Sequence, residues 1–389
     1  MRLNSLSGLC VRPNEKEKTL DECFHGGQLF CSVGQDFSRL RNRDLSYAAD
    51  VLDAWYPPAP AVIETLKSHL PWTCRTSPPP SNLNIISLIS SEYQLGAEQI
   101  VLGHGSSDLI YRVLPSLIDE RGALIIKPAY GEYEHVIQNL LDIKVVSYST
   151  ADNNFELDVD DIIRHANNDK VSAVILINPC NPTGQVFSRK QLLKLHEGVS
   201  KNTNLIIDET YSEYCNREYS LANIVGDVSN LAIFKSLSKT YALSGMRAGF
   251  CILNKELARY HQQRTPPYTI PMPTQVALFE TFKNKSYYQE QIERTHLSRD
   301  HFCSLLNSDA PQLKTLPSSI NSVLIDLEKS AGDAEDLRKY LAKKSIYIRN
   351  IDSQGISRHG RYVRVSILSK TDMSVIADAI SEWHQELQK

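Results

Sequence analysis

The chain has 389 residues, of which 42% are hydrophobic and 22% charged, and its formal net charge is −3. This length exceeds what one hydrophobic core usually organises, so two domains are expected, and the composition is that of a soluble globular protein. The weakly acidic charge provides no basic surface for DNA or RNA, which argues against a function in nucleic-acid binding.

The eight cysteines are scattered and form no Cys-x-x-Cys pair, so neither a zinc site nor a disulfide framework is indicated. No stretch reaches the roughly 18 apolar residues of a membrane span. Residues 1–20 contain no apolar run of signal-peptide length. We therefore expect a cytoplasmic protein in a reducing compartment, with no resident metal and no membrane partner.

Residues 1–45 are polar and mixed in sign, and they predict an irregular arm with one short helix. The next stretch, residues 50–60, contains three prolines. Because proline cannot donate a backbone hydrogen bond, this stretch is predicted to be extended or turn structure. Residues 62–70 then have the spacing of an amphipathic helix.

Residues 100–110 predict a strand, a glycine turn and the start of a helix. Gly103 and Gly105 allow the backbone to approach a ligand closely, and Ser106 is a good N-cap residue. The first N–H groups of a helix and its dipole bind phosphate. This pattern is not a dinucleotide-binding fingerprint, because its last glycine and the later acidic residue are missing.

A strand over residues 123–127 ends at Pro128, which places Tyr130 at its carboxyl end. Open α/β sheets bind their ligands at the carboxyl ends of strands. Tyr130 is therefore a candidate for ligand contact, and a purely structural tyrosine is the alternative. A helix over residues 131–141 and a strand over residues 144–149 are predicted to follow.

Two further apolar strands also end in polar residues. Residues 171–177 run into Asn-Pro-Cys-Asn-Pro-Thr-Gly, where two Asn-Pro pairs and a glycine fix a rigid loop containing Asn181. Residues 204–207 run into Asp208. A buried aspartate is costly unless it is paired, so a positively charged partner is expected at this strand end.

The stretch 236–247 connects two apolar strands at residues 231–234 and 248–253. It places Lys239 at a tight connection, flanked by Ser236 and Ser238 and followed by Arg247. A lysine amine in such a position can condense with a carbonyl compound. The hydroxyl groups and the guanidinium can bind a phosphate dianion. A surface lysine in a loop is the alternative for this stretch alone.

The C-terminal part predicts a second domain. Residues 255–305 are helical, with interruptions at prolines, and they lead into strands at 322–325, 346–349 and 362–368 and helices at 334–344 and 372–388. In the alternating strand 362–368, Arg364 points to the face opposite its apolar neighbours. A side chain on a solvent-exposed face of the strand is the alternative explanation for such an arginine.

The motifs at 103–107, 128–130, 178–184, 208–211 and 236–247 together resemble those of fold-type I enzymes that use pyridoxal 5′-phosphate. Within the class I/II aminotransferases, the chain is most similar to the branch that holds histidinol-phosphate aminotransferase and threonine-phosphate decarboxylase. The resemblance runs from about residue 50 to the end.

The resemblance implies an α/β fold, in which helices sandwich a mostly parallel sheet in a large domain and a smaller α+β domain is added. The expected divisions are an N-terminal arm over 1–49 that is part of the small domain, a large cofactor-binding domain over 50–270 and a small domain over 271–389. It also implies a homodimer with active sites at the interface.

The same resemblance assigns roles to the residues at the motif positions. Lys239 would bind the cofactor covalently and act in catalysis with Asp208, which pairs with the pyridine nitrogen. Tyr211 and Asn181 would hydrogen-bond the phenolic oxygen, and Tyr130 would stack on the ring. The cofactor phosphate would be bound by Ser106, Ser107, Ser236, Ser238 and Arg247.

For the substrate, the resemblance assigns Arg364 to the α-carboxylate and Arg349 to a distant acidic group. The chain departs from the family at Ser77, where histidinol-phosphate aminotransferases carry a tyrosine that reaches the partner subunit's cofactor phosphate. Asp53 or Trp55 would take the place of an expected asparagine at the mouth of the site, and a proline-rich packing arm is the alternative for this stretch. Both departures argue against a simple transfer of the histidinol-phosphate substrate.

The expected activity is transfer of an amino group from an amino acid, or an amine derived from one, to an α-keto acid. A decarboxylase resembling the threonine-phosphate enzyme, and an amino-acid oxidase or cyclase, stay open as alternatives. A transcriptional regulator that senses the cofactor is disfavoured, because residues 1–45 are too short and too weakly basic for a DNA-binding appendage.

Overall fold

The computed structural model describes residues 27–33, 37–355 and 359–388. Most of the arm predicted over residues 1–45 lies outside this described part. Within its described portion, helix α1 (Leu29–Val33) and a 3-10 helix over Leu40–Leu45 are present. None of the described helices is both long enough and apolar enough to cross a membrane.

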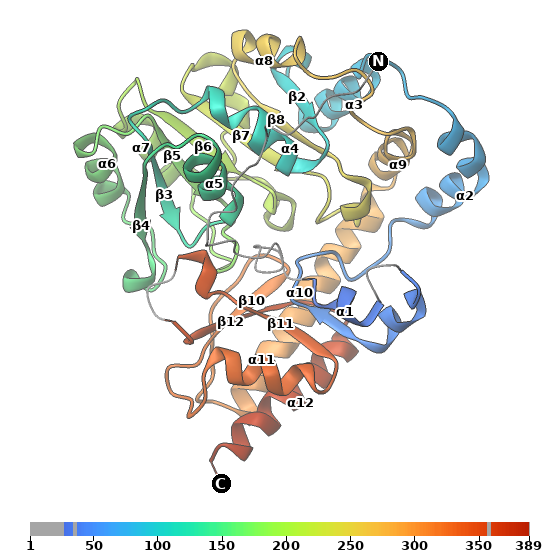
Figure 1. Ribbon diagram of the computed structural model, residues 1–389, viewed down its shortest axis with the longest axis vertical. Helices are drawn as coiled ribbons and strands as arrows, with labels where there is room; N and C mark the ends of the chain where they lie inside the picture. The colour runs from blue at the N-terminus through green and yellow to red at the C-terminus, as the bar shows by residue number, and fades with distance from the viewer. Residues whose placement is uncertain (1–26, 34–36, 356–358, 389) are drawn as a thin grey trace, which may run out of the picture.

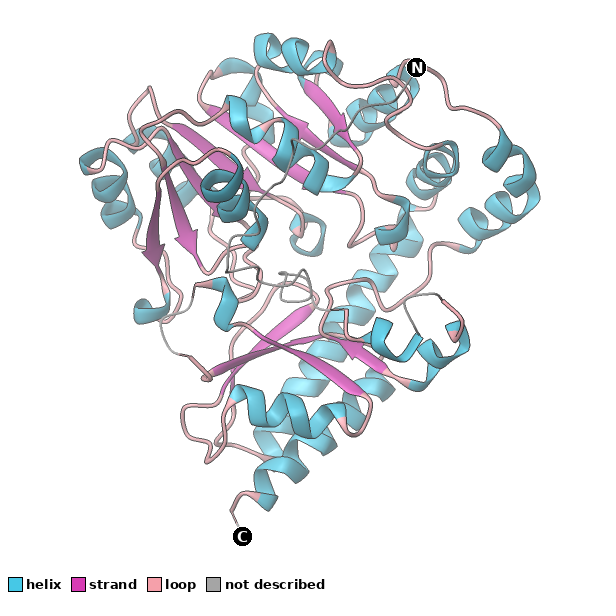
Figure 2. Cartoon of the chain, in the orientation of Figure 1, coloured by secondary structure: helices cyan, strands magenta, loops and turns pink. Residues whose placement is uncertain are grey.

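A seven-stranded sheet forms the larger part of the molecule, and helices cover both of its faces (Figures 1 and 2). The five strands from β7 to β4 are parallel, while β8 runs antiparallel to both β7 and β2. This confirms the predicted α/β class with a mostly parallel sheet. In spatial order the strands are β2 (Ile100–Gly103), β8 (Gly249–Ile252), β7 (Leu231–Ser236), β6 (Asn204–Asp208), β5 (Ala173–Ile177), β3 (Ala123–Lys127) and β4 (Val145–Ser149).

The central strands are apolar and buried on both faces, as expected for a parallel sheet covered by helices. One face packs into a core that includes Ile89, Leu192 and Leu278, and the other into a core that includes Leu109 and Tyr133. The surrounding helices are α2 (Pro60–Arg75), α3 (Leu83–Tyr93), α4 (Gly105–Arg112), α5 (Gly131–His135), α6 (Val159–Asn168), α7 (Arg189–Gly198), α8 (Lys255–Gln262) and α9 (Met272–Lys283).

A second sheet of five strands packs against the C-terminal helices in the lower half of Figure 1. Its core contains Phe302, Leu337 and Trp383. In spatial order the strands are β1 (Tyr47–Ala49), β11 (Ile346–Asn350), β12 (Tyr362–Ser366), β10 (Ser322–Asp326) and β9 (Lys314–Thr315), and the helices are α10 (Lys285–Asp309), α11 (Ala334–Ala342) and α12 (Lys370–Glu386).

One detail differs from the sequence-based expectation. The helix predicted over 131–141 is a short α-helix, α5, followed by a π-helical turn over Val136–Leu140. Helix α9 and Tyr288 contribute to a core of the seven-stranded sheet, although they follow residue 270. The domain boundary at that residue therefore stays a prediction.

Candidate active site

The sheet and the C-terminal strands meet around a cavity of about 250 Å³ at the carboxyl ends of the parallel strands. Parallel strands end at one edge of a sheet, so residues far apart in sequence converge there. The cavity is lined by Val51, Leu52, Ser106, Ser107, Tyr130, Glu132, Ile177, Asn181, Asp208, Thr210, Tyr211, Lys239, Arg247, Gln354 and Arg364. Most of the predicted site residues are thus in one place.

Lys239 follows strand β7 and reaches the cavity from the connection to β8. Its Nζ lies 2.8 Å from Oδ1 of Asp53, and its side chain is 23% exposed. The Ser244 hydroxyl donates to the same carboxylate oxygen at 2.7 Å. Burial acts to raise the pKa of Asp53, but the charge of Lys239 and the two hydrogen bonds outweigh it, so this pKa is lowered. The amine therefore has a carboxylate partner at the cavity wall.

The glycine turn at the start of α4 lies beside Ser106, Ser107 and Arg247 of the cavity lining. Gly105 has a φ of +82°, and a Cβ atom there would lie 2.4 Å from Nη2 of Arg247. The guanidinium thus occupies space that only glycine leaves open. Nη1 of Arg247 donates to the Ser244 carbonyl at 3.1 Å. The arrangement puts a cation beside the first N–H groups of α4, which suits an anion.

The predicted N-cap at Ser106 is wrong. Helix α4 begins at Gly105, and His104 occupies the N-cap position without a side-chain capping hydrogen bond. Because Gly105 turns the chain one residue earlier, Ser106 lies inside the first helical turn and lines the cavity. The hydroxyl of Ser107, which also lines it, donates to Oε1 of Glu132 at 3.0 Å.

Asp208 ends strand β6 and is 4% exposed. Its Oδ2 accepts from the Tyr133 hydroxyl at 2.8 Å, and its Oδ1 accepts from the Thr210 N–H at 2.9 Å. Burial raises the pKa of Asp208, while these hydrogen bonds oppose the increase. A buried carboxylate with lone pairs left over favours a positively charged hydrogen-bond donor in the cavity.

Arg364 enters the cavity from strand β12 and is 4% exposed, so it is no solvated strand residue. Its Nη1 donates to Oδ1 of Asn181 at 2.8 Å, and its Nη2 donates to the Asp50 carbonyl at 2.5 Å. Burial, reinforced by the charge of Arg349, lowers the pKa of Arg364 to about 10. Its Nε has no hydrogen-bond partner among the described residues, which leaves a donor for a ligand.

Asn181 and Tyr211 complete this side of the cavity. Nδ2 of Asn181 donates to the Tyr211 hydroxyl at 3.4 Å. Burial raises the pKa of Tyr211, although the charge of Arg364 opposes this effect. Burial and the charge of Glu132 likewise raise the pKa of Tyr130. Both tyrosines therefore stay neutral and able to donate hydrogen bonds at ordinary pH.

Some predicted residues do not line the cavity. Ser236 and Ser238 lie beside Lys239, where the Ser238 N–H donates to Oγ of Ser236 at 3.2 Å and the Ser238 hydroxyl has no partner in the described structure. Arg349 is the cross-strand neighbour of Arg364, and burial lowers its pKa. Ser77 is exposed in the loop after α2.

Sequence reasoning missed two polar residues that line the cavity, Glu132 and Gln354. Glu132 directly follows the turn that carries Tyr130, so its position after a strand end was an available signal. Gln354 belongs to a short 3-10 helix beyond β11, and its buried Oε1 lacks a partner among the described residues. No local pattern marks that glutamine, because the tertiary fold alone brings it to the cavity.

The lining matches the parts of pyridoxal phosphate one by one. The Lys239 amine can react with an aldehyde, the Asp208 carboxylate can pair with a pyridinium, and Tyr211 with Asn181 can bind a phenolate. The Gly105 turn, with Arg247 beside it, is an anion cradle that a Cβ atom would fill. The residues present therefore fit this cofactor.

Comparison with known proteins agrees with this geometry. The family pattern for aminotransferase class I and II matches residues 74–380. A histidinol-phosphate aminotransferase of Clostridium kluyveri is 28% identical over 292 residues, which cover 74% of this chain and 78% of that protein.

Two solved structures share the fold. The histidinol-phosphate aminotransferase of Sinorhizobium meliloti in complex with pyridoxal-5′-phosphate has a TM-score of 0.82 at 19% identity, covering 97% of this chain and 99% of that one. The L-threonine-O-3-phosphate decarboxylase of Porphyromonas gingivalis has a TM-score of 0.72 at 20% identity, covering 88% and 99%. Because the family pattern spans most of its length, the chain belongs to the class I and II aminotransferases, enzymes that transfer amino groups.

Proposed function

We propose that this aminotransferase uses pyridoxal 5′-phosphate bound covalently at Lys239, and that it moves an amino group from an amino acid or related amine to an α-keto acid. The observation that carries the proposal is the meeting of Lys239, Asp208, Arg364 and the start of α4 in one cavity. An amine, a buried carboxylate, a carboxylate-binding arginine and a phosphate cradle together suit this cofactor and an acidic substrate.

The chain's own residues have distinct tasks in this proposal. Asp208 holds a proton on the pyridine nitrogen, which keeps that nitrogen positively charged. When bound, the cofactor supplies an electron-withdrawing ring that stabilises negative charge at Cα of the amino donor. Nζ of Lys239 takes the proton from Cα and later returns a proton, acting as general base and then as general acid.

Binding and orientation come from the remaining lining residues. Tyr211 and Asn181 fix the phenolic oxygen, and Tyr130 covers one face of the ring. The hydroxyls of Ser106 and Ser107 and the guanidinium of Arg247 bind the phosphate. Ser236 and Ser238 do not line the cavity, and we propose that they support the phosphate end from their position beside Lys239.

Arg364 sets the class of substrate. Its guanidinium can bind a planar carboxylate or a phosphate through two parallel hydrogen bonds, so we propose donors with an acidic group. The names of the sequence relatives make histidinol phosphate one candidate donor. Arg349 is proposed to assist with a second acidic group. The exposed Ser77 removes the tyrosine expected from the resemblance, so an ordinary α-amino acid is an equal candidate.

A labelling experiment tests the activity. The protein, loaded with pyridoxal phosphate, would be incubated with α-ketoglutarate and a panel of donors carrying isotopically labelled nitrogen, including histidinol phosphate and common α-amino acids. We expect the label to appear in glutamate with at least one donor, and Lys239→Ala to abolish the transfer. Release of carbon dioxide or peroxide without nitrogen transfer would instead favour a decarboxylase or an oxidase.

We also propose that the chain forms a homodimer with the active sites near the subunit interface. Leu70, Trp72 and Leu83 are large apolar residues that are 50%, 44% and 68% exposed on or beside α2 and α3. Single exposed apolar residues are ordinary, but three on two successive helices suit a contact surface. Light scattering coupled to size exclusion would give a dimer mass if this is correct and a monomer mass if it is not.

A further inference from the structure

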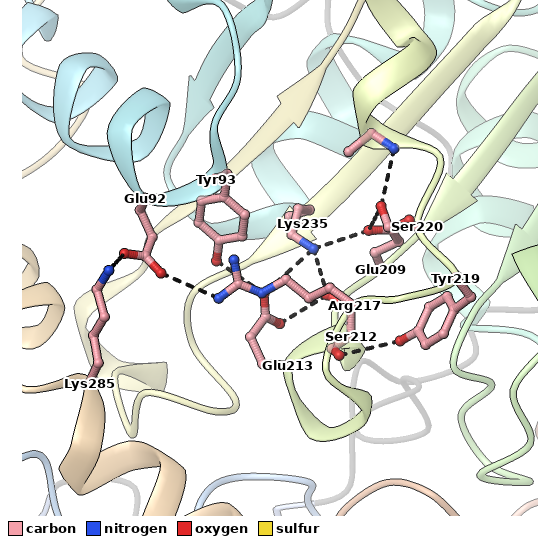
Figure 3. Close-up of polar contacts among 11 residues, drawn as sticks. Glu92, Tyr93, Glu209, Ser212, Glu213, Arg217, Tyr219, Ser220, Lys235 and Lys285 are labelled. Carbon is pink, nitrogen blue, oxygen red and sulfur yellow. Dashed lines mark hydrogen bonds and ion pairs between the residues drawn. The ribbon is translucent and has the colours of Figure 1, made fainter.

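A buried ion cluster (Figure 3) lies beside Tyr93, which packs on one face of the sheet, whereas Tyr133, the partner of Asp208, belongs to the core on the other face. Its centre is Lys235 in β7, which is 2% exposed, and its nearest carboxylate belongs to Glu209, which is fully buried. Burying a charge is costly unless it is paired and hydrogen-bonded. The cluster takes no part in the proposed chemistry, so its presence directly behind the active site calls for an explanation.

Lys235 contacts three side chains of one short segment. Its Nζ lies 3.1 Å from Oε2 of Glu209, 2.5 Å from Oγ of Ser212 and 3.5 Å from Oε1 of Glu213. The Ser212 hydroxyl in turn donates to Oε2 of Glu213 at 3.1 Å. The Ser220 hydroxyl donates to Oε2 of Glu209 at 2.8 Å. Besides the backbone hydrogen bond from the Glu209 N–H to the Phe234 carbonyl at 2.8 Å, one ammonium group thus joins three side chains of the segment 209–213 to β7.

The cluster continues outward with balanced charges. Arg217 lies 3.5 Å from Glu213 and 3.4 Å from Glu92, and Glu92 also pairs with Lys285 at 2.5 Å. The Tyr93 hydroxyl donates to Glu213 at 3.0 Å, while the guanidinium of Arg217 stacks 4.3 Å from the Tyr93 ring centroid. The carboxylates nearest Lys235 are thus held in place from their far side as well (Figure 3).

The segment 208–213 also carries three cavity residues, Asp208, Thr210 and Tyr211. Asp208 directly precedes Glu209, and Tyr211 directly precedes Ser212. Successive residues of a strand point to opposite faces. Accordingly, Asp208 contacts Tyr133 in the core on one face of the sheet, while Glu209 contacts Lys235 on the other face. On β7, the same ammonium lies four residues before Lys239.

We propose that Lys235 is a positioning residue: from behind the sheet it fixes the segment 208–213, and thereby holds Asp208 and Tyr211 in place for the cofactor. This inference rests on the proposed function for the identity of that ligand. The positive charge of Lys235 also favours the carboxylate form of Asp208, opposing the burial that raises the pKa of Asp208. The contacts of Lys235 and its positive charge therefore both favour a fixed, charged carboxylate at Asp208.

Three variants separate positioning from general stability. Lys235→Met removes the ammonium, and Ser212→Ala removes one of its contacts without unbalancing the charges. Asn230→Ala is the matched control, because Asn230 joins the same two strands at their other ends: its Nδ2 donates to the Thr203 carbonyl at 3.2 Å, and its Oδ1 contacts Nε2 of His196 at 3.0 Å.

The readouts are the dissociation constant for pyridoxal phosphate, from an absorbance titration, and hydrogen exchange of the 208–213 amides in the cofactor-free protein. Lys235→Met should weaken binding by about 10- to 100-fold, the range that loss of a ligand-orienting partner costs at metal sites, and should speed exchange in 208–213. Ser212→Ala should shift both in the same direction by a smaller factor. Asn230→Ala should lower the unfolding midpoint but leave both readouts unchanged.

The proposal is wrong if Lys235→Met and Asn230→Ala affect binding and exchange alike at matched stability. If Lys235→Met does not fold, Ser212→Ala decides, and wild-type binding and exchange in that variant would overturn the proposal. A wild-type protein that fails to bind pyridoxal phosphate would refute the proposed function instead. The exchange comparison would then still show whether Lys235 holds the segment.

Discussion

Replacing Asp208 by asparagine should affect the cofactor-free protein and the cofactor complex in opposite directions. In the structure, Oδ1 accepts from the Thr210 N–H and Oδ2 accepts from the Tyr133 hydroxyl. An asparagine has the same shape, so its carbonyl can still accept from Thr210 while its amide donates to the Tyr133 oxygen. We therefore expect Asp208→Asn to fold.

The stability effect follows from the raised pKa of Asp208, which burial causes. Because the folded state holds this proton more tightly than the unfolded state does, the stabilisation is fully present below the usual carboxyl pKa of about 4. It is lost as the pH rises through the raised pKa. Without cofactor, Asp208→Asn should thus become increasingly more stable than the wild type from pH 4 to pH 8, as measured by urea unfolding.

Cofactor binding should change in the other direction. A hydrogen bond to a charged group contributes about 1.5–3 kcal/mol, and 1.4 kcal/mol corresponds to about tenfold in affinity. Losing the carboxylate opposite a protonated pyridine should therefore weaken pyridoxal phosphate binding by about 10- to 150-fold. Absorbance titration measures this, with Asp158→Asn, at the N-cap of α6, as a carboxylate control outside the cavity.

Unchanged affinity in Asp208→Asn would refute the assigned pairing with the pyridine nitrogen. A variant that is less stable than the wild type at pH 8 would refute the argument from burial. The two measurements are independent, so each part of the reasoning can fail alone.

Three other substitutions test the remaining walls of the cavity. Arg364→Lys keeps the positive charge but loses the two parallel N–H donors of the guanidinium, so KM for an acidic donor should rise by about 10- to 150-fold. In the wild type, binding of the acidic donor should weaken above the Arg364 pKa of about 10. Gly105→Ala introduces a Cβ atom 2.4 Å from Nη2 of Arg247 at a φ of +82°, and the strained backbone should lower the free energy of unfolding by about 1–2 kcal/mol. Because the Cβ atom displaces the guanidinium, paired titrations should show weaker binding of pyridoxal phosphate and a smaller effect on pyridoxal. Asp53→Ala frees the Lys239 amine from a half-exposed ion pair worth at most about 1 kcal/mol. Stopped-flow absorbance should therefore record covalent capture of the cofactor up to about fivefold faster. Slower capture would contradict the argument.

Residues at strand ends were predictable from the sequence, because apolar runs mark the buried strands and their carboxyl ends share one edge of the sheet. Asn181, Asp208 and Tyr130 are of this kind, and the structure places all three on the cavity. The position of Lys239 between two apolar strands likewise placed it at an end of the sheet. Hydrophobic pattern and short-range spacing were sufficient here.

Other parts of the site depend on contacts between distant segments, which local patterns do not encode. Asp53 reaches Lys239 across 186 positions of the chain, and Gln354 comes from the connection between β11 and β12 of the second sheet. Lys235 directly follows the apolar run 231–234, and its charge is buried beside Glu209 and Glu213, a pairing that no local pattern indicates. The domain boundary and the role of Arg349 stay predictions.

The covalent link at Lys239 is the claim on which the proposed function depends most. It is tested by treating the protein loaded with pyridoxal phosphate with borohydride, digesting it and mapping the modified peptide by mass spectrometry. We predict stoichiometric modification at Lys239 and none in Lys239→Ala. Modification of a different lysine, or a wild-type protein that stays unlabelled and colourless, would contradict the assignment.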